Sequence, residues 1–238
     1  YLRFDVPQRT LQDGTEHTPL DVEYVERLTA ELAENDVEAV AVCFLHSFAN
    51  PAAEREAREI IKRIAPEMRV SISADVVPEI REFERASTTI ANVYVQELVE
   101  KYLRQLENRL ADNGFVGNFY LMLSSGGIAT VDTAIKFPVR LLESGPAAGA
   151  LAAHAYGQAT GHNDIISFDM GGTTAKASLI EGGKLLKADD YEVGGGISLS
   201  SKLAQGGGYA LKLPVIDISE VGAGGGSTVW RDRAGAPK

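Results

Sequence analysis

Apolar residues recur along the first half of the chain at two alternating spacings. In residues 21–34 and 52–64 they lie three or four positions apart, which predicts amphipathic helices. Residues 37–45 form a nearly continuous apolar run, typical of a strand buried on both faces, and residues 69–73 alternate as a strand does. Helices and strands in alternation indicate βα units and a largely parallel sheet, so we expect an α/β fold.

The longest helix is expected over residues 87–108, ahead of another strand at residues 119–123. Its apolar positions predict a stripe that packs against the core. The members of this stripe are Ile90, Val93, Val95, Leu98, Val99, Leu103, Leu106 and Leu110.

Glycine usage changes near Ser144, since 19 of the 24 glycines follow it. A helix over residues 146–156, with Ser144 as its N-cap, is predicted to precede two antiparallel hairpins. The hairpins turn at Gly171–Gly172 and at residues 181–184. This change of pattern predicts a domain boundary near Leu141. The clusters of three glycines that follow have no fixed period, so they do not indicate a structural repeat.

Composition narrows the classes of partner and compartment. The formal net charge of −10 argues against nucleic acid and against an anionic membrane, since both require a basic surface. The single cysteine, Cys43, lies inside an apolar run, where a buried structural thiol is favoured over a nucleophile. No apolar run has the length of a membrane span and no signal segment opens the chain, so a cytoplasmic protein is expected.

A phosphate-binding hairpin is indicated where an apolar run ends in the sequence Asp-Met-Gly-Gly-Thr-Thr. Gly171 and Gly172 would let a phosphate approach the backbone amides. The hydroxyls of Thr173 and Thr174 would donate to its oxygens. Asp169 at the strand end would hold a hydrated Mg²⁺, and it is the residue that we expect to be catalytic. The alternative is an ordinary tight hairpin, because Gly-Gly is also a common hairpin turn.

Two further positions offer contacts to an anion. Lys176 follows the turn and would either contact phosphate or point to solvent. Ser144 and Gly145 open a helix whose amides and dipole favour an anion, although the same small residues suit close packing against a sheet. Glu143 beside them would repel a phosphate unless a metal intervened.

A glycine-rich loop near the end of the chain is the last candidate for this site. Gly224, Gly225 and Gly226 would present bare amides to a nucleotide or substrate, or would form a flexible linker. Asp217, which follows a short apolar run, is a candidate for a second carboxylate facing the metal.

The segment 78–85 is dense in alternating charges, which is typical of a solvated surface with weak ion pairs. A functional role for it would be substrate contact or interdomain pairing by Arg81 and Arg85. The four histidines show no metal-ligand spacing, and only His46, expected at the end of a strand, is a candidate ligand-binding residue. No Ser-His-Asp or Cys-His arrangement can be assembled, which argues against nucleophilic hydrolysis.

Four segments together resemble one protein family. Asp-Met-Gly-Gly-Thr-Thr is similar to the phosphate loops of the actin and sugar-kinase ATPase superfamily. Segments 78–85, 143–149 and 221–227 resemble those of the hydantoinase A/5-oxoprolinase family, and they occur in that family's order. The resemblance implies a fragment of an actin-like (ribonuclease H-like) ATPase fold. Residues 1–141 would belong to its first half, and residues 142–238 would begin its second half.

The resemblance also implies an activity, namely the ATP-dependent hydrolytic opening of a cyclic amide such as a hydantoin or 5-oxoproline. ATP and Mg²⁺ would be the cofactors, and a hydantoinase B-like chain would be a second subunit. The family's first phosphate loop is absent from these residues, so we expect part of an ATP site and an inactive fragment. The alternatives are a subunit of an ATP-dependent ketone (acetone or acetophenone) carboxylase, a sugar-kinase-like ATPase and a non-catalytic interaction domain.

Overall fold

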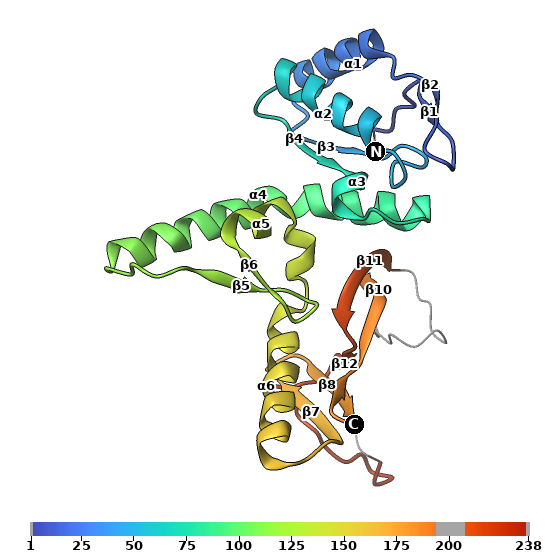
Figure 1. The fold of residues 1–238 in the computed structure, drawn as a ribbon. Coiled ribbons are helices and arrows are strands. Elements are labelled where there is room, and N and C mark those ends of the chain that lie inside the picture. The colour runs from blue at the N-terminus through green and yellow to red at the C-terminus, as the bar shows by residue number, and fades with distance from the viewer. Residues whose placement is uncertain (1, 194–207, 237–238) are drawn as a thin grey trace. The chain divides into compact units, whose positions relative to one another are not determined.

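The computed structural model describes residues 2–193 and 208–236, which fall into two compact units (Figure 1). Unit 1 comprises Tyr1–Leu121, Ala129–Leu142 and Ala210–Leu213, and unit 2 comprises Met122–Ile128, Glu143–Tyr209 and Pro214–Lys238. Each unit contains apolar clusters of its own. The glycine cluster at residues 194–196 and most of the one at 206–208 lie outside the described residues.

Unit 1 begins with a layered α/β arrangement. Two parallel strands pair in register from Ala39↔Arg69 to Val42↔Ile72, which confirms the predicted βα unit. Helices α1 and α2 pack on one side of these strands and helix α4 on the other (Figure 1). The elements up to this helix are β1 (Arg9–Thr10), β2 (Glu16–Thr18), α1 (Val22–Glu34), β3 (Ala39–Val42), α2 (Ala52–Ile64), β4 (Arg69–Ile72), α3 (Ser73–Val76) and α4 (Glu82–Asp112).

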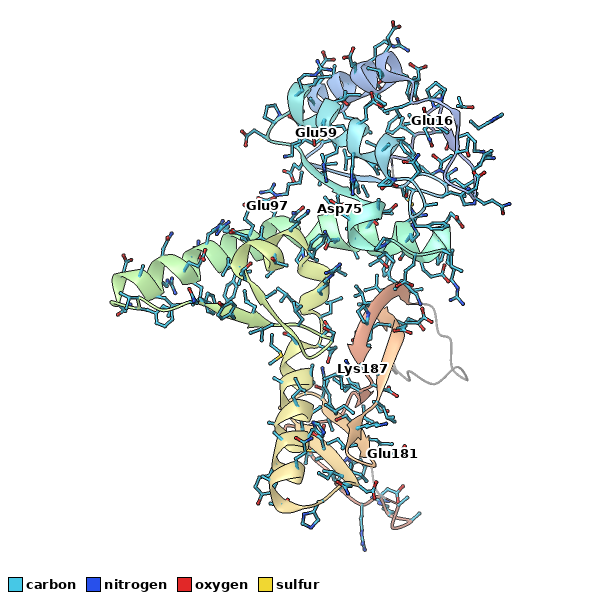
Figure 2. All side chains as sticks on the ribbon, in the orientation of Figure 1. Glu16, Glu59, Asp75, Glu97, Glu181 and Lys187 are labelled. Carbon is cyan, nitrogen blue, oxygen red and sulfur yellow. The ribbon has the colours of Figure 1, made fainter. Side chains whose placement is uncertain are left out.

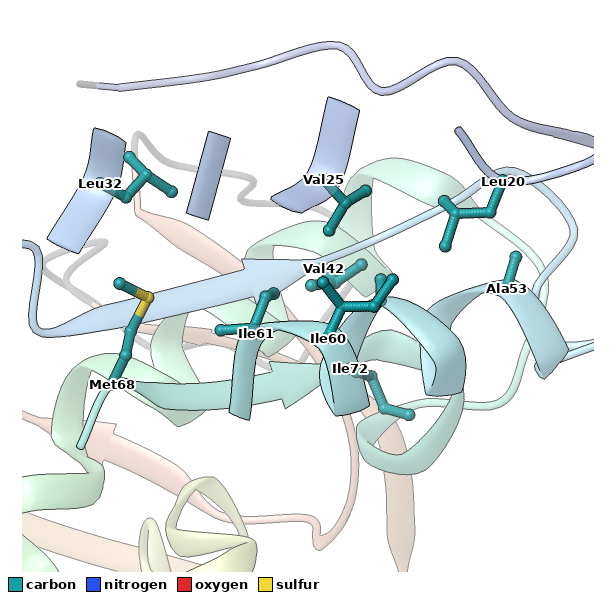
Figure 3. Packing of buried hydrophobic residues seen from close by; sticks show 10 residues of the cluster. Leu20, Val25, Leu32, Val42, Ala53, Ile60, Ile61, Met68 and Ile72 are labelled. Carbon is teal, nitrogen blue, oxygen red and sulfur yellow. The ribbon is translucent and has the colours of Figure 1, made fainter. Parts of the chain in front are cut away.

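The apolar core of this part lies where α1, α2, β3 and β4 meet, and Figure 3 shows its side chains. Val25 on α1, Ile60 on α2 and Ile72 on β4 are all buried in it. Strand β3 is shorter than the run 37–45 predicted. Helices pack on both faces of this strand, but only Val42 is buried and Ala39, Val40 and Ala41 are half-buried, so the expected burial on both faces is only partial.

Helix α4 spans 31 residues, longer than expected, and its buried face is only partly the predicted one. Val93 and Leu103 of the predicted stripe are buried. Ile90 and Leu98 are exposed by 53% and 73%, whereas Arg85, Thr88 and Asn92 are fully buried. The hydroxyl of Thr88 and the amide of Asn92 are hydrogen bonded, as most buried polar groups are. The Asn92 amide donates at 3.0 Å to a serine hydroxyl on β4 and at 3.0 Å to the carbonyl of Lys136, the last residue of α5.

A second apolar cluster in unit 1 joins the far end of α4 to α5, around Leu103 and Ala134. The elements that follow α4 are β5 (Tyr120–Met122), its partner β6 (Ile128–Thr130), α5 (Val131–Lys136) and a 3-10 helix at Pro138–Leu141. Charged side chains such as Glu59 and Glu97 line the outer surfaces of this unit (Figure 2).

Unit 2 contains a helix and an antiparallel sheet of order β12-β8-β7, in which β9 also pairs with β8. Both predicted hairpins are confirmed, the first running from Ile165↔Ile180 to Met170↔Ala175 and the second closing at Glu181↔Lys184. Strands β10 and β11 form a separate pair. The elements are α6 (Ser144–Thr160), β7 (Ile165–Met170), β8 (Ala175–Glu181), β9 (Lys184–Leu185), β10 (Lys187–Val193), β11 (Tyr209–Ile216) and β12 (Ser219–Val221).

The start of α6 differs from the prediction in its capping residue. Ser144 is the first helical residue, and Glu143 occupies the N-cap position with a left-handed φ of 58° and no side-chain cap. Within the described ranges, none of the helices combines the length and the apolar character needed to cross a membrane.

Candidate functional site

The turn between β7 and β8 is a tight hairpin in which several backbone amides have no acceptor among the described residues. The Gly171 amide donates to the Thr174 carbonyl at 2.9 Å, which closes the turn. The amides of Gly172, Thr173 and Thr174 donate to no described residue. Neither glycine of the turn needs a left-handed φ, so glycine is not required here for backbone conformation. The turn therefore presents three consecutive backbone donors.

The glycine-rich loop packs directly against this turn. The Gly225 amide donates to the Gly171 carbonyl and the Gly226 amide to the Gly172 carbonyl, both at 2.9 Å. A Cβ on Gly224 would lie 2.7 Å from the Gly171 carbonyl oxygen, so only glycine fits at this approach. Two of the three loop amides thus donate to the turn. The loop therefore supports the turn, and these two amides are not free to donate to a ligand.

Three charged side chains form a row across the sheet, one strand apart from each other. Asp169 on β7 is opposite Lys176 on β8, which in turn is opposite Glu220 on β12. Directly opposed residues in antiparallel strands project from the same face. The row therefore lies on one face of the sheet, immediately beside the turn.

Lys176 is the centre of this row and is held in a cluster of ion pairs rather than pointing to solvent. Its ammonium group is paired with the carboxylate of Glu143 and lies 3.7 Å from that of Glu220. The side chains of Lys176, Glu143 and Glu220 are only 15%, 21% and 27% exposed. Reduced solvent screening strengthens such a pair.

Tyr191 on β10 extends the same cluster. Burial is the largest cause of a raised pKa for its phenol, followed by the negative charges of Glu143 and Glu220. A hydrogen bond from the phenol to Glu143 acts in the same direction. All three effects disfavour the tyrosinate, so the phenol stays protonated and donates to the carboxylate.

The ion pair also brings the start of α6 to the turn. Because Glu143 contacts Lys176, the first residues of the helix, Ser144 and Gly145, lie on the same side of the sheet as the charged row. The first amides of a helix have no intrahelical partner and favour an anion. Lys176 neutralises Glu143 there, which removes the objection that this carboxylate would repel a phosphate.

Asp169 is the candidate ligand for a magnesium ion. In the described part of the chain, no group of three or more His, Cys, Asp or Glu residues is arranged to hold a metal ion. Asp169 is exposed and makes no ion pair with a described residue. One free carboxylate fits Mg²⁺, which commonly takes one or two carboxylates and completes its shell with water and substrate phosphates. Asp217 follows β11, and its amide donates to the Leu186 carbonyl at 3.0 Å.

The segment 78–85 contributes one residue with a structural role. Arg85 is fully buried in unit 1, where it contacts the hydroxyls of Ser47 and Ser73 and lies 3.7 Å from the carboxylate of Glu54. That carboxylate is fully buried as well and accepts three hydrogen bonds. The interpretation of the whole segment as a solvated surface is wrong for Arg85, which is fully buried, with contacts through Nη2, while its Nε and Nη1 atoms have no hydrogen-bond partner among the described residues.

His46 does not end a strand, since β3 stops at Val42. It adopts a left-handed φ of 58° in a turn, and its Nδ1 lies 3.0 Å from the Thr10 carbonyl oxygen. Its ring packs edge-on against Phe48. These contacts give the histidine a structural role in the turn.

The structure thus gathers three of the predicted segments, the hairpin turn, the glycine-rich loop and the helix start. The functional assignments of their residues stay predictions. Sequence reasoning missed Glu220 and Tyr191. In the sequence, each is only an acidic or phenolic residue in a short strand of alternating pattern. Such residues are common on protein surfaces, so nothing marked these two as members of the site.

Comparisons with known proteins match the chain along its whole length. The family model "Hydantoinase/oxoprolinase" matches residues 85–238, and the model of that family's N-terminal region matches residues 1–65. An uncharacterised protein of Methanocaldococcus jannaschii is 42% identical over 98% of this chain and 34% of its own length. Caprolactamase subunit alpha of Pseudomonas jessenii is 29% identical over 99% of this chain and 32% of its own.

The fold of this chain also matches that of a solved structure. Nucleotide-free acetone carboxylase matches with a TM-score of 0.77 and 29% identity, over 98% of this chain and 31% of that one. Acetone carboxylase has an actin-like ATPase fold, so the predicted fold class is confirmed. The chain spans about a third of the length of the relatives that it matches.

Proposed function

The chain belongs to the hydantoinase/oxoprolinase family, and from this we propose that it is part of a subunit that opens a cyclic amide at the expense of ATP. The observation that carries the proposal is the convergence of the turn, the glycine-rich loop and the start of α6. Three turn amides that donate to no described residue lie next to an exposed carboxylate and a helix start. Such a combination of backbone donors suits the phosphate groups of a nucleotide.

The residues of this site would have different roles in binding ATP. The amides of Gly172, Thr173 and Thr174, with the two threonine hydroxyls, would donate to phosphate oxygens. Gly171, Gly225 and Gly226 would fix the turn through the hydrogen bonds between turn and loop. Lys176 would act through Glu143, by cancelling the charge that this residue brings to the first amides of α6.

Asp169 is the residue that would hold Mg²⁺, and the nucleotide would supply further oxygen ligands. When bound, the ion would neutralise charge on the phosphates during transfer. The carboxylate is exposed at the end of β7, next to the donors of the turn, where it can reach a bound phosphate chain without disrupting another contact.

The proposed reaction begins with attack of the amide oxygen on the γ-phosphorus of ATP, and ADP leaves with the electron pair of the broken P–O bond. Water then adds to the activated carbon, and the C–N bond breaks as the nitrogen takes a proton. A second water displaces phosphate from the resulting acyl phosphate. One cyclic amide, one ATP and two waters give the ring-opened amino acid, ADP and phosphate. Phosphorylation removes the amide resonance that resists hydrolysis, and the protein positions the phosphoryl group.

ATP-dependent carboxylation of a ketone is the second candidate, because one of the matching solved structures is that of an acetone carboxylase. The same phosphate site would serve both reactions. A partner subunit is proposed for either case, since the caprolactamase relative is itself named as a subunit.

The direct test is calorimetric titration of Mg·ATP into this chain and into the full-length polypeptide. Binding by the full-length form alone would support a site completed by residues outside this chain. Absence of binding by both folded proteins would contradict the proposal. Release of ADP by the assembled enzyme, measured with hydantoin, lactam and 5-oxoproline, and with ketone plus bicarbonate, then separates the two reactions.

A further inference from the structure

The hairpin β1–β2 (Figure 1) and the turn that follows β3 border a cavity of about 360 Å³ in unit 1. A volume of this size suits a small molecule. The walls come from residues 9–13 on the hairpin and from Leu45 and His46 on the turn. None of these residues belongs to the proposed phosphate site, so the cavity needs an explanation of its own.

Hydrogen bonds fix the hairpin against the turn. The side-chain amide of Asn50 donates to the Gly14 carbonyl at 2.9 Å, and the imidazole Nδ1 of His46 lies 3.0 Å from the Thr10 carbonyl oxygen. Both contacts join residues 36 positions apart in the sequence. The cavity is therefore formed by the fold itself, as ligand sites usually are.

His46 brings a nitrogen atom without a protein partner to this cavity. A carbonyl oxygen can only accept, so Nδ1 carries the proton and the lone pair of the neutral ring is on Nε2. That nitrogen makes no hydrogen bond to a described residue. The backbone of His46 is left-handed, with a φ of 58°, and such uncommon conformations concentrate at binding sites. The contact with Thr10 holds the turn, and it leaves Nε2 as an acceptor for a ligand.

Two opposite charges line the same cavity. Asp13 accepts a hydrogen bond from the Thr15 amide at 2.9 Å, which is the largest cause of a lowered pKa, so its side chain is a carboxylate at neutral pH. Arg9 is always charged. Neither side chain forms an ion pair with a described residue, although both line one cavity. A ligand that carries both charges would satisfy both of them.

We propose that this cavity binds a small zwitterionic amino acid. Its carboxylate pairs with the guanidinium of Arg9, which suits a planar anion with two oxygens. Its ammonium group donates to the carboxylate of Asp13 and to Nε2 of His46. Leu11 and Leu45 cover the methylene groups between the two ends.

Other classes of ligand fit these residues less well. A simple anion would be repelled by Asp13, and a simple cation by Arg9. Within the described residues, no three His, Cys, Asp or Glu side chains are arranged for a metal ion. The inference rests on the cavity alone, and it holds whether or not the phosphate turn binds ATP. The ring-opened amino acid of the proposed reaction belongs to the same chemical class.

Calorimetric titration into the full-length polypeptide, without ATP or Mg²⁺, tests the proposal. The zwitterions are glycine, 4-aminobutanoate and 6-aminohexanoate, which separate the two charges by increasing lengths. Hexanoate and hexylamine are the matched probes, because each keeps a methylene chain with one charge only. We expect at least one zwitterion to bind at least about tenfold more tightly than either single-charge probe.

Two variants then locate the bound zwitterion. Arg9→Gln and His46→Asn should each weaken its binding at least about tenfold. Asparagine is chosen at position 46 because it tolerates a left-handed φ. Arg3→Gln is the control, since it removes the same charge from an exposed arginine outside the cavity, and it should bind as the unmodified protein does.

Any of four results would overturn the proposal. These are the absence of zwitterion binding, equally tight binding of hexanoate or hexylamine, undiminished affinity in either cavity variant, and an equal loss of affinity in Arg9→Gln and Arg3→Gln.

Discussion

Gly224 lies against Gly171 so closely that a single methyl group on Gly224 would come within 2.7 Å of the Gly171 carbonyl oxygen. The two residues are distant in the sequence, yet the loop of one holds the turn of the other through two backbone hydrogen bonds. The atoms in the way belong to backbone, which cannot rotate aside as a flexible side chain can.

The variant Gly224→Ala should therefore separate the loop from the turn. We expect a loss of about 1–3 kcal/mol in the free energy of unfolding, the usual cost of overpacking, measured by urea denaturation. Gly222→Ala is the matched control, because a Cβ there meets no atom within 4 Å and its φ is not left-handed. The proposed role of the loop would be contradicted by equal stability of the two variants.

Lys176→Met should destabilise unit 2, because it leaves Glu143 and Glu220 facing each other in a partly buried cluster. We expect a cost of about 1–2 kcal/mol, between the values for exposed and buried ion pairs. The double variant Lys176→Met/Glu143→Gln should recover part of this loss, since it removes one of the repelling charges. Thermal unfolding of the unmodified protein, Lys176→Met, Glu143→Gln and the double variant measures the coupling, and strictly additive effects would argue against the ion pair.

The pH dependence of stability should carry a contribution from Tyr191. Its pKa in the folded protein is raised above the ordinary value of 10.0, so its stabilisation is present below that pH. As the pH rises above 10.0, the unfolded chain loses this proton before the folded protein does, and stability falls. Tyr191→Phe should make that fall shallower in guanidinium unfolding between neutral and alkaline pH. Tyrosinate absorbance should show one fewer tyrosine with a high pKa.

Local patterns predicted the hairpins and the helix bounds of α1 and α2, because these elements follow from spacing within a few residues. The face of α4 was not predictable in the same way. Val93 and Leu103 of the predicted stripe are buried, but Ile90 and Leu98, which fit the same stripe by spacing, are exposed. The polar residues Arg85 and Asn92 are buried instead, through tertiary contacts that spacing does not reveal.

The candidate site was predictable as separate segments but not as an assembly. The glycine motif indicated donors, whereas the ion pair between Glu143 and Lys176 joins residues 33 positions apart. Long-range pairing of this kind depends on how strands and helix pack, and a single sequence carries no signal for it. The loop glycines were predicted to donate hydrogen bonds to a ligand. Their close packing against the turn depends on tertiary contact too, so the sequence alone did not reveal it.

Arg85→Met tests the structural role of the segment 78–85. The substitution leaves the fully buried carboxylate of Glu54 without its charge partner, and breaking such a pair costs about 3–5 kcal/mol. Arg81→Met is the control in the same segment, where a side chain 55% exposed should cost less than about 1 kcal/mol. Adding Glu54→Gln to Arg85→Met should cost less than the sum of the single changes, because the orphaned charge is then removed. Chemical denaturation measures the free energy of unfolding of Arg85→Met, Arg81→Met, Glu54→Gln and the double variant.

Asp169→Asn should separate nucleotide binding from folding. The carboxylate is exposed and makes no ion pair with a described residue, so its loss should leave the unfolding midpoint unchanged. An amide is a poorer ligand for Mg²⁺ than a carboxylate, because it lacks the charge that a hard cation prefers. In the full-length polypeptide we expect Mg·ATP to bind at least about tenfold more weakly, or 1.4 kcal/mol. Asp189→Asn, at an exposed aspartate on β10, removes the same charge away from the turn and should bind as the unmodified protein does. Equal affinity of both variants would mean that Asp169 holds no metal.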